Sequence, residues 1–186
     1  DLSIKIMGML MAYGGKPQSE TARLTRYDVV LKEVPHINFE YAIQGKKRQK
    51  HRLPLVGVML EVVEEYISTF SGGQDDLLFP NLDRMDSGSR SKAINKHTKE
   101  MHPIRNTVFE PYGLRHTFRP RYEEAGITTV NGMYLFGHKS DQTTATHEGY
   151  AKGLFKSKEF KQLSDDMEKV MAVTSWNYTY LVSDFD

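Results

Sequence analysis

The amino-acid sequence predicts a mainly α-helical domain with a small antiparallel β-sheet, a fold of the α+β class. Three observations lead to this prediction. Apolar residues recur at helical spacing in several segments, strand-like alternation is confined to one short region, and the two strand-like segments are consecutive. At 186 residues, the chain is long enough for one domain with a substantial core.

The composition is that of an ordinary soluble globular protein, with 39% hydrophobic and 26% charged residues. No apolar run approaches the roughly 20 residues of a membrane span, and there is no signal-peptide pattern. The sequence has no cysteine, which excludes disulfides and thiolate metal sites and is typical of cytoplasmic proteins. Because the chain begins at Asp1, we expect it to be part of a longer protein.

The first half of the chain predicts helices around a β-hairpin. Residues 4–14 are rich in Met, Leu and Ile and predict a buried helix, after which Pro17 favours the start of a short second helix. Alternating apolar residues from Ile37 onward predict a strand with one buried face. We interpret residues 37–56 as a hairpin whose pairing ends at Pro54.

Most of the remaining chain predicts helices. Apolar periodicity or chain punctuation favours helices over residues 57–70, 91–101, 112–125, 128–136 and 155–172. Pro80 is expected to end a short apolar element, and residues 81–90 are expected to form a polar loop. The predicted domain covers residues 1–174, and the apolar tail 175–186 is expected to cover a surface on its own domain or on a neighbouring protomer.

The net charge of +1 carries no overall signature of nucleic-acid binding, but the basic residues are unevenly distributed. Five of them fall within seven positions of the predicted hairpin: Lys46, Lys47, Arg48, Lys50 and Arg52. This segment is either a solvated basic loop or a positive face for a polyanion.

An arginine, a histidine and a tyrosine follow in the second half, as Arg115, His138 and Tyr150. A tyrosine hydroxyl can break a phosphodiester if cations hold the non-bridging oxygens and an acid protonates the leaving oxygen. A histidine can donate a hydrogen bond or take the tyrosine proton, and a lysine at the hairpin tip can serve as the acid. Taken singly, each residue has a more ordinary interpretation, as a surface ion-pair partner, a cap or a packing residue.

Six motifs occur in a fixed order between about residues 8 and 153. They are Ser19-Glu20 with Leu24 and Asp28-Val29, Gly45-Lys46 with Arg52 to Leu55, Leu78-Phe79-Pro80, Tyr112 to Phe118, Leu135 to Ser140, and Tyr150-Ala151-Lys152. Together they resemble the catalytic domain of the tyrosine recombinases, the phage integrase family. The resemblance implies a site-specific recombinase, bacterial or phage-encoded, that cuts and rejoins double-stranded DNA through a 3′-phosphotyrosyl intermediate.

The resemblance also implies roles for individual residues. Tyr150 corresponds to the nucleophile, Arg115 to the second catalytic arginine, which clamps the phosphate, and His138 to the second conserved histidine position. Lys46 corresponds to the general acid, and Tyr112 stands where a histidine is usual. Glu20 matches an acidic supporting residue, and the expected DNA contacts are Lys47, Arg48, Lys50, Arg52 and Lys139.

No cofactor or metal is expected. The implied assembly is a homotetramer on DNA and a monomer or weak oligomer without it, with a DNA-clamping N-terminal domain outside this chain.

One departure from the family pattern concerns the first arginine. It is expected three residues before Glu20, where the sequence has Pro17, preceded by Lys16. Lys16 can replace the arginine if the turn shifts by one residue, although a lysine loses the bidentate geometry. Two alternatives therefore stay open: a catalytically impaired member that acts in DNA binding or regulation, and a relaxing DNA topoisomerase of the same tyrosine chemistry.

Overall fold

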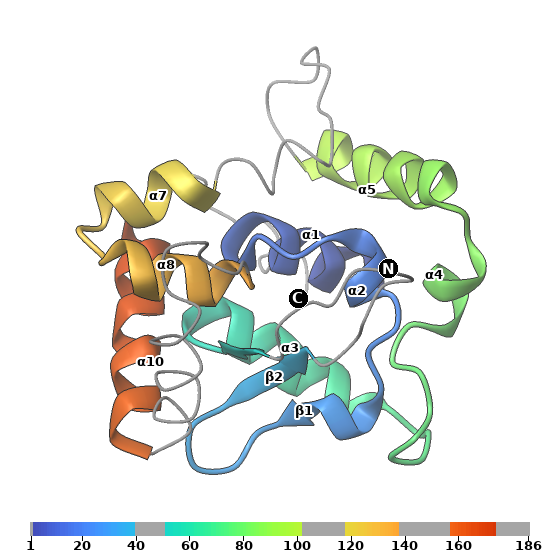
Figure 1. The fold of residues 1–186 in the computed structure, drawn as a ribbon. Coiled ribbons are helices and arrows are strands. Elements are labelled where there is room, and N and C mark those ends of the chain that lie inside the picture. Colours follow the sequence, from blue (N-terminus) through green and yellow to red (C-terminus); the bar gives the residue numbers. More distant parts are fainter. Residues whose placement is uncertain (1, 40–50, 102–117, 138–156, 174–186) are drawn as a thin grey trace, which may run out of the picture.

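The computed structural model describes residues 2–39, 51–101, 118–137 and 157–173 (Figure 1). Within these ranges most residues are helical, and one antiparallel sheet has the strand order β1-β2-β3. The predicted fold class is therefore confirmed. None of the helices in the described ranges is long and apolar enough to cross a membrane.

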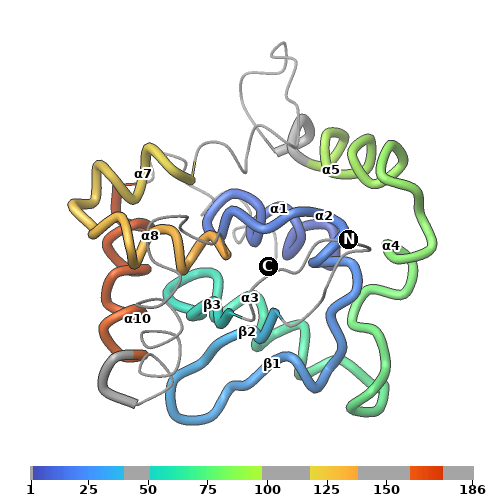
Figure 2. Tube along the Cα trace, viewed as in Figure 1, coloured from blue at the N-terminus to red at the C-terminus, as the bar shows by residue number. Residues whose placement is uncertain are grey.

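Helix α1 (Leu2–Gly14) lies at the centre of the molecule, where it packs against α3, α5 and α7 (Figure 2). Its residues are buried on nearly all sides, which explains why its sequence is apolar without a polar face. The helix ends at Gly14, and the next residue, Gly15, has a φ of +61°, in the left-handed region that glycine adopts at little cost. The predicted buried helix is thus confirmed.

A short helix, α2 (Gln18–Thr21), follows Pro17 and leads through the 3-10 turn η1 (Arg26–Asp28) into strand β1 (Val29–Val30). Strand β2 (His36–Phe39) pairs with β1 on one side and with β3 (His51–Pro54) on the other. The predicted hairpin is confirmed over its paired residues, and its tip, residues 40–50, lies outside the described ranges. The two-residue strand β1 is an addition to the prediction.

Helix α3 (Gly57–Thr69) confirms the predicted amphipathic helix. The prediction of a polar loop over 81–90 is wrong, because α4 (Pro80–Arg84) and α5 (Ser87–Met101) occupy most of it. Pro80 starts α4 instead of ending an element, since a proline at the first helical position gives up no intrahelical hydrogen bond. Asp86 accepts hydrogen bonds from the backbone amide and hydroxyl of Ser89, as a helix N-cap does, so α5 begins four residues before the predicted start.

Three helices close the described part of the chain. Helix α7 (Phe118–Glu124) lies within the predicted helix 112–125, whose first residues are outside the described ranges, and Gly126 follows it with a φ of +68°. Helix α8 (Thr129–Phe136) is capped at its start by the Thr128 hydroxyl, and Gly137 follows its last residue as the C-cap. Helix α10 (Ser157–Ala172) packs against α7, α8 and β3. The tail 175–186 is not among the described residues.

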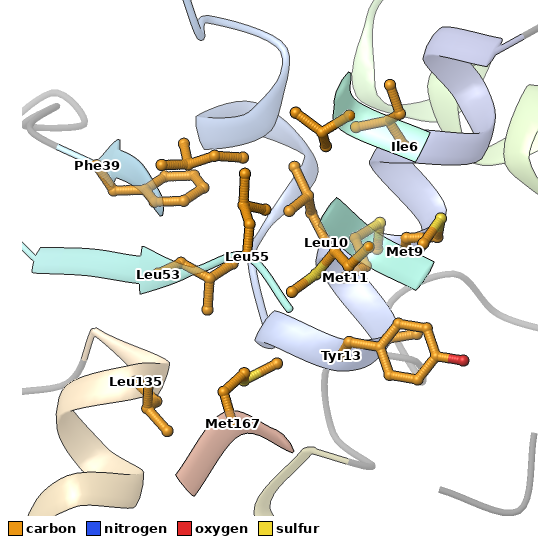
Figure 3. Close-up of a cluster of buried hydrophobic side chains, with 14 of the residues drawn as sticks. Ile6, Met9, Leu10, Met11, Tyr13, Phe39, Leu53, Leu55, Leu135 and Met167 are labelled. Atoms are coloured by element: carbon orange, nitrogen blue, oxygen red, sulfur yellow. The ribbon is translucent and has the colours of Figure 1, made fainter. Parts of the chain in front are cut away.

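One hydrophobic cluster connects these elements (Figure 3). Leu10 of α1, Leu53 of β3, Leu135 of α8 and Met167 of α10 are each fully buried in it. A single contiguous cluster of this kind is what one folded domain has. Because both the hairpin and α8 contribute to the cluster, the core holds their ends at fixed places relative to α1.

Candidate functional site

Three predicted site residues, Lys16, Glu20 and Arg52, lie in the described part of the structure. The others lie outside it: Lys46, Lys47, Arg48, Lys50, Tyr112, Arg115, His138, Lys139 and Tyr150. Their roles stay predictions. The described residues that border their segments nevertheless show how the surrounding framework is built.

Lys16 follows the turn at the end of α1 and is fully buried, with 0% of its surface exposed. Its Nζ donates a hydrogen bond of 2.5 Å to the carbonyl oxygen of Leu135 and lies 2.5 Å from Nε2 of His51. The ring centroid of Phe39 is 5.1 Å from the same nitrogen, within the range of a cation–π contact. The ammonium is therefore directed at protein groups from β2, β3 and α8.

Helix α8 offers a favourable partner for this cation. The last carbonyls of a helix have no intrahelical donor, and the C-terminal end of a helix carries a partial negative charge. Leu135 is the next-to-last residue of α8, so its carbonyl oxygen is suited to accept from the buried ammonium. This contact offsets part of the cost of removing the Lys16 charge from water.

His51 begins strand β3, and 4% of its surface is exposed. Its ring stacks on Phe39 with centroids 5.2 Å apart and an interplanar angle of 7°. An ammonium that donates to His51 as well as to Leu135 requires His51 to accept through Nε2, and hence to be neutral with its hydrogen on Nδ1. In the sequence His51 stands only as a member of a basic segment, and no motif signals its contact with Lys16.

Gly137, which follows the last residue of α8, lies against the ring of this histidine. It caps the helix with a φ of +78°, and a β-carbon at this position would lie 2.6 Å from Cε1 of His51. Such an approach is open to glycine alone, because no other residue lacks the β-carbon. His138 is the next residue in the sequence.

The turn after α1 also contacts the start of α7 and the end of α8. The rings of Phe118, the first residue of α7, and Phe136, the last residue of α8, stack with centroids 5.6 Å apart. A β-carbon on Gly15 would lie 2.6 Å from the Phe136 ring and 3.2 Å from that of Phe118. The start of α7 and the end of α8 therefore meet at the turn that presents Lys16.

Glu20 lies in α2, four residues after Lys16, and is 3% exposed. Its backbone amide donates to the carbonyl oxygen of Pro17, the residue that precedes α2. Lys16, Pro17 and Glu20 thus belong to one short turn between α1 and the end of α2. The supporting role predicted for Glu20 stays a prediction.

Arg52 neighbours His51 on β3, and successive residues of a strand point to opposite faces of the sheet. Its guanidinium lies 5.8 Å from the ring centroid of Phe160 on α10. The same ring makes an edge-to-face contact with His36, with centroids 5.0 Å apart. Burial lowers the pKa of His36 below its ordinary value of 6.5, and the nearby positive charge of Arg52 acts in the same direction. In the described ranges, no group of three or more His, Asp or Glu side chains is arranged to hold a metal ion.

Comparison with known proteins finds one matching family and one curated relative. The Phage integrase family matches residues 1–152. A tyrosine recombinase of Pseudothermotoga lettingae is 25% identical over 142 residues, which cover 76% of this chain and 48% of that protein. The chain thus spans about half the length of this curated relative. No solved structure matches the chain. The family match covers most of the chain and all six motifs, so the chain belongs to the phage integrase family.

Proposed function

We propose that the chain is the catalytic part of a site-specific recombinase that cuts and rejoins double-stranded DNA through a 3′-phosphotyrosyl intermediate. The family match and the tyrosine recombinase relative support this proposal. The observation that carries it is the meeting of four segments: the turn at Lys16, the hairpin at His51, the start of α7 at Phe118 and the end of α8 at Gly137. Each of the last three borders a segment with a predicted site residue.

In the proposed reaction, the Tyr150 hydroxyl oxygen attacks a DNA phosphorus and the bond from phosphorus to the 5′ oxygen breaks. Lys46 gives its proton to that leaving oxygen, and His138 is the candidate acceptor of the tyrosine proton. Arg115 holds two non-bridging oxygens through its planar fork, and Tyr112 donates a further hydrogen bond. The 5′-hydroxyl of a partner strand then attacks the phosphotyrosine, releases the Tyr150 hydroxyl and restores a phosphodiester. The covalent link thus conserves the energy of the phosphodiester bond, and no cofactor is consumed.

Covalent capture from a randomised pool tests this proposal and identifies the DNA site in the same experiment. The full-length protein is incubated with nicked duplexes that carry a randomised core, and SDS-stable adducts are isolated and sequenced. We expect adducts enriched in one sequence, with none from a Tyr150→Phe variant, because only the hydroxyl is lost in that change. Adducts that persist in the Tyr150→Phe variant, or none from the wild type, would overturn the assignment.

A second candidate function is DNA binding by a member with impaired catalysis. It is favoured by the two positions at which the first cation of the site is expected: Pro17 is uncharged, and Lys16 is fully buried with its ammonium directed at Leu135 and His51. A Pro17→Arg variant introduces an arginine at the partly buried position that precedes α2. Faster adduct formation by this variant than by the wild type would support impairment, and equal rates would oppose it.

The proposed partner is double-stranded DNA. We propose that the protein binds it as a homotetramer, with the tail 175–186 as a candidate contact between protomers. If Lys47, Arg48, Lys50, Arg52 and Lys139 contact phosphates, binding releases counterions and weakens steeply as salt rises. A titration of DNA at several salt concentrations measures this slope, and affinity that does not change with salt would contradict the proposed contacts.

Deletion of residues 175–186 should prevent the tetramer on DNA while leaving the melting temperature of the monomer unchanged. A lower melting temperature would show that the tail packs on its own domain.

A further inference from the structure

Lys16 and His51 are 35 residues apart in the sequence and meet in the interior of the fold. Both side chains are almost completely removed from water, with exposures of 0% and 4%. A buried lysine is rare because its charge needs polar partners to replace the lost water. Such a pair is therefore kept only where the surrounding segments supply those partners.

The partners of the pair come from separate segments of the chain. Lys16 follows α1, His51 and Phe39 form the last described pair of the hairpin, and Leu135 belongs to the end of α8. The stacking of His51 on Phe39 and the close approach of Gly137 leave the histidine ring little freedom to move. The contacts of Lys16 are satisfied together only when the hairpin and the end of α8 stand at fixed positions relative to α1.

The two segments held in this way lead directly to predicted site residues. In the sequence, Lys46 lies five residues before His51, in the segment that continues from the Phe39–His51 pair, and His138 follows Gly137. On the basis of the proposed function, we propose that Lys16 and His51 are positioning residues. They fix the base of the basic hairpin against the end of α8, which the core already holds through Leu135, so that the general acid, Lys46, is delivered to the leaving oxygen. Lys16 then acts through the framework and does not touch the phosphate.

A substrate that needs no general acid separates positioning from stability. In a duplex with sulfur in place of the bridging 5′ oxygen, attack by Tyr150 breaks the phosphorus–sulfur bond and releases a 5′-thiolate. A thiolate leaves without protonation, because thiols are far more acidic than alcohols. A Lys46→Ala variant, used as the reference, should be slow on ordinary DNA and restored on the sulfur substrate.

The informative variants change the hydrogen bond and keep the ring or the acceptor. His51→Phe keeps a ring to stack on Phe39 but loses the acceptor for Lys16, whereas His51→Gln offers an amide oxygen in place of Nε2. We expect single-turnover adduct formation by His51→Phe on ordinary DNA to fall about 10- to 100-fold at saturating DNA, as a misplaced catalytic group does. On the sulfur substrate its rate should return close to that of the wild type, and His51→Gln should keep most of the rate on both substrates.

A paired variant guards against loss of folding. Lys16→Met with His51→Phe replaces both polar groups by apolar ones, which is often neutral for stability in the interior. If this double variant melts like the wild type yet keeps the defect on ordinary DNA alone, the positioning role is supported. Equal losses on the two substrates, or full activity on ordinary DNA, would overturn it. No adduct from the wild type on either substrate would instead overturn the proposed function, and this inference with it.

Discussion

Replacement of Gly137 by alanine tests the close contact between the end of α8 and the hairpin. Gly137 has a φ of +78°, and an added β-carbon would lie 2.6 Å from Cε1 and 2.9 Å from Nδ1 of His51. Carbon atoms in contact are ordinarily about 3.5–4.0 Å apart, so the ring or the helix end must move by about 1 Å. The ring has little room for this, because it stacks on Phe39 and bonds to Lys16.

The magnitude follows from two separate costs. An L-residue with a side chain costs about 1–2 kcal/mol in the left-handed region, and overpacking of a filled interior costs about 1–3 kcal/mol more. The Gly137→Ala variant should therefore lose about 2–5 kcal/mol of the free energy of unfolding. Each 1 kcal/mol lowers the melting temperature by roughly 2–4 °C in a chain of this size.

Gly126 supplies the matched control. Its φ of +68° is similar, and nothing lies within 4 Å of the position that an added β-carbon would take, so Gly126→Ala has only the backbone cost. Urea unfolding followed by circular dichroism measures both variants, and a His51→Ala background removes the ring from the comparison. In that background Gly137→Ala should cost no more than Gly126→Ala. If Gly137→Ala and Gly126→Ala lose the same free energy of unfolding with His51 in place, the close contact between residue 137 and the His51 ring does not contribute to the cost.

Two further predictions concern stability. Because burial lowers the pKa of His36 below its ordinary value of 6.5, the folded state binds fewer protons than the unfolded state there. The contribution of His36 to stability should be full above pH 6.5 and fall as the pH drops below it toward the lower folded-state pKa. Between pH 7 and 5, a His36→Gln variant should lose less free energy of unfolding than the wild type. The same pH dependence of the free energy of unfolding in variant and wild type would contradict this. Asp166 on α10 is 5% exposed and accepts a 2.7 Å hydrogen bond from Nδ2 of Asn131 on α8. The same carboxylate accepts from Nε2 of Gln162 and forms an ion pair with Lys169 at 3.2 Å. Asp166→Asn should lower the free energy of unfolding by about 1–3 kcal/mol in urea, while the change at exposed Asp165→Asn should be near zero. Similar values for the two variants would contradict the stabilising role of these contacts.

Local patterns in the sequence predicted much of the fold. The apolar run of α1, the alternation at Ile37 and Phe39, and the glycines that follow α7 and α8 each depend on near neighbours in the chain. Pro80 was misinterpreted because proline both ends elements and starts helices, and the difference depends on the residues that follow. Strand β1 was missed because two residues give too short a pattern to recognise.

The sequence names residues for the candidate site, whose roles stay predictions, but it does not predict the geometry of those that the structure describes. Order and spacing pointed to a cation near Glu20, yet they do not say which way a side chain is directed. Lys16 is directed inward because Leu135, from a helix 119 residues later, supplies an acceptor for it. The contact of Lys16 with His51 likewise depends on the packing of distant segments, and no local pattern encodes it.

The identity of the residue that becomes linked to DNA is the decisive test of the proposed tyrosine chemistry. An SDS-stable adduct of the full-length protein is digested with nuclease and protease, and mass spectrometry locates the nucleotide on the peptides. We expect a single modified peptide, with a 3′-phosphonucleotide on Tyr150. A nucleotide on another residue, Tyr112 included, or an unmodified Tyr150 peptide in every adduct, would contradict the proposed role of Tyr150.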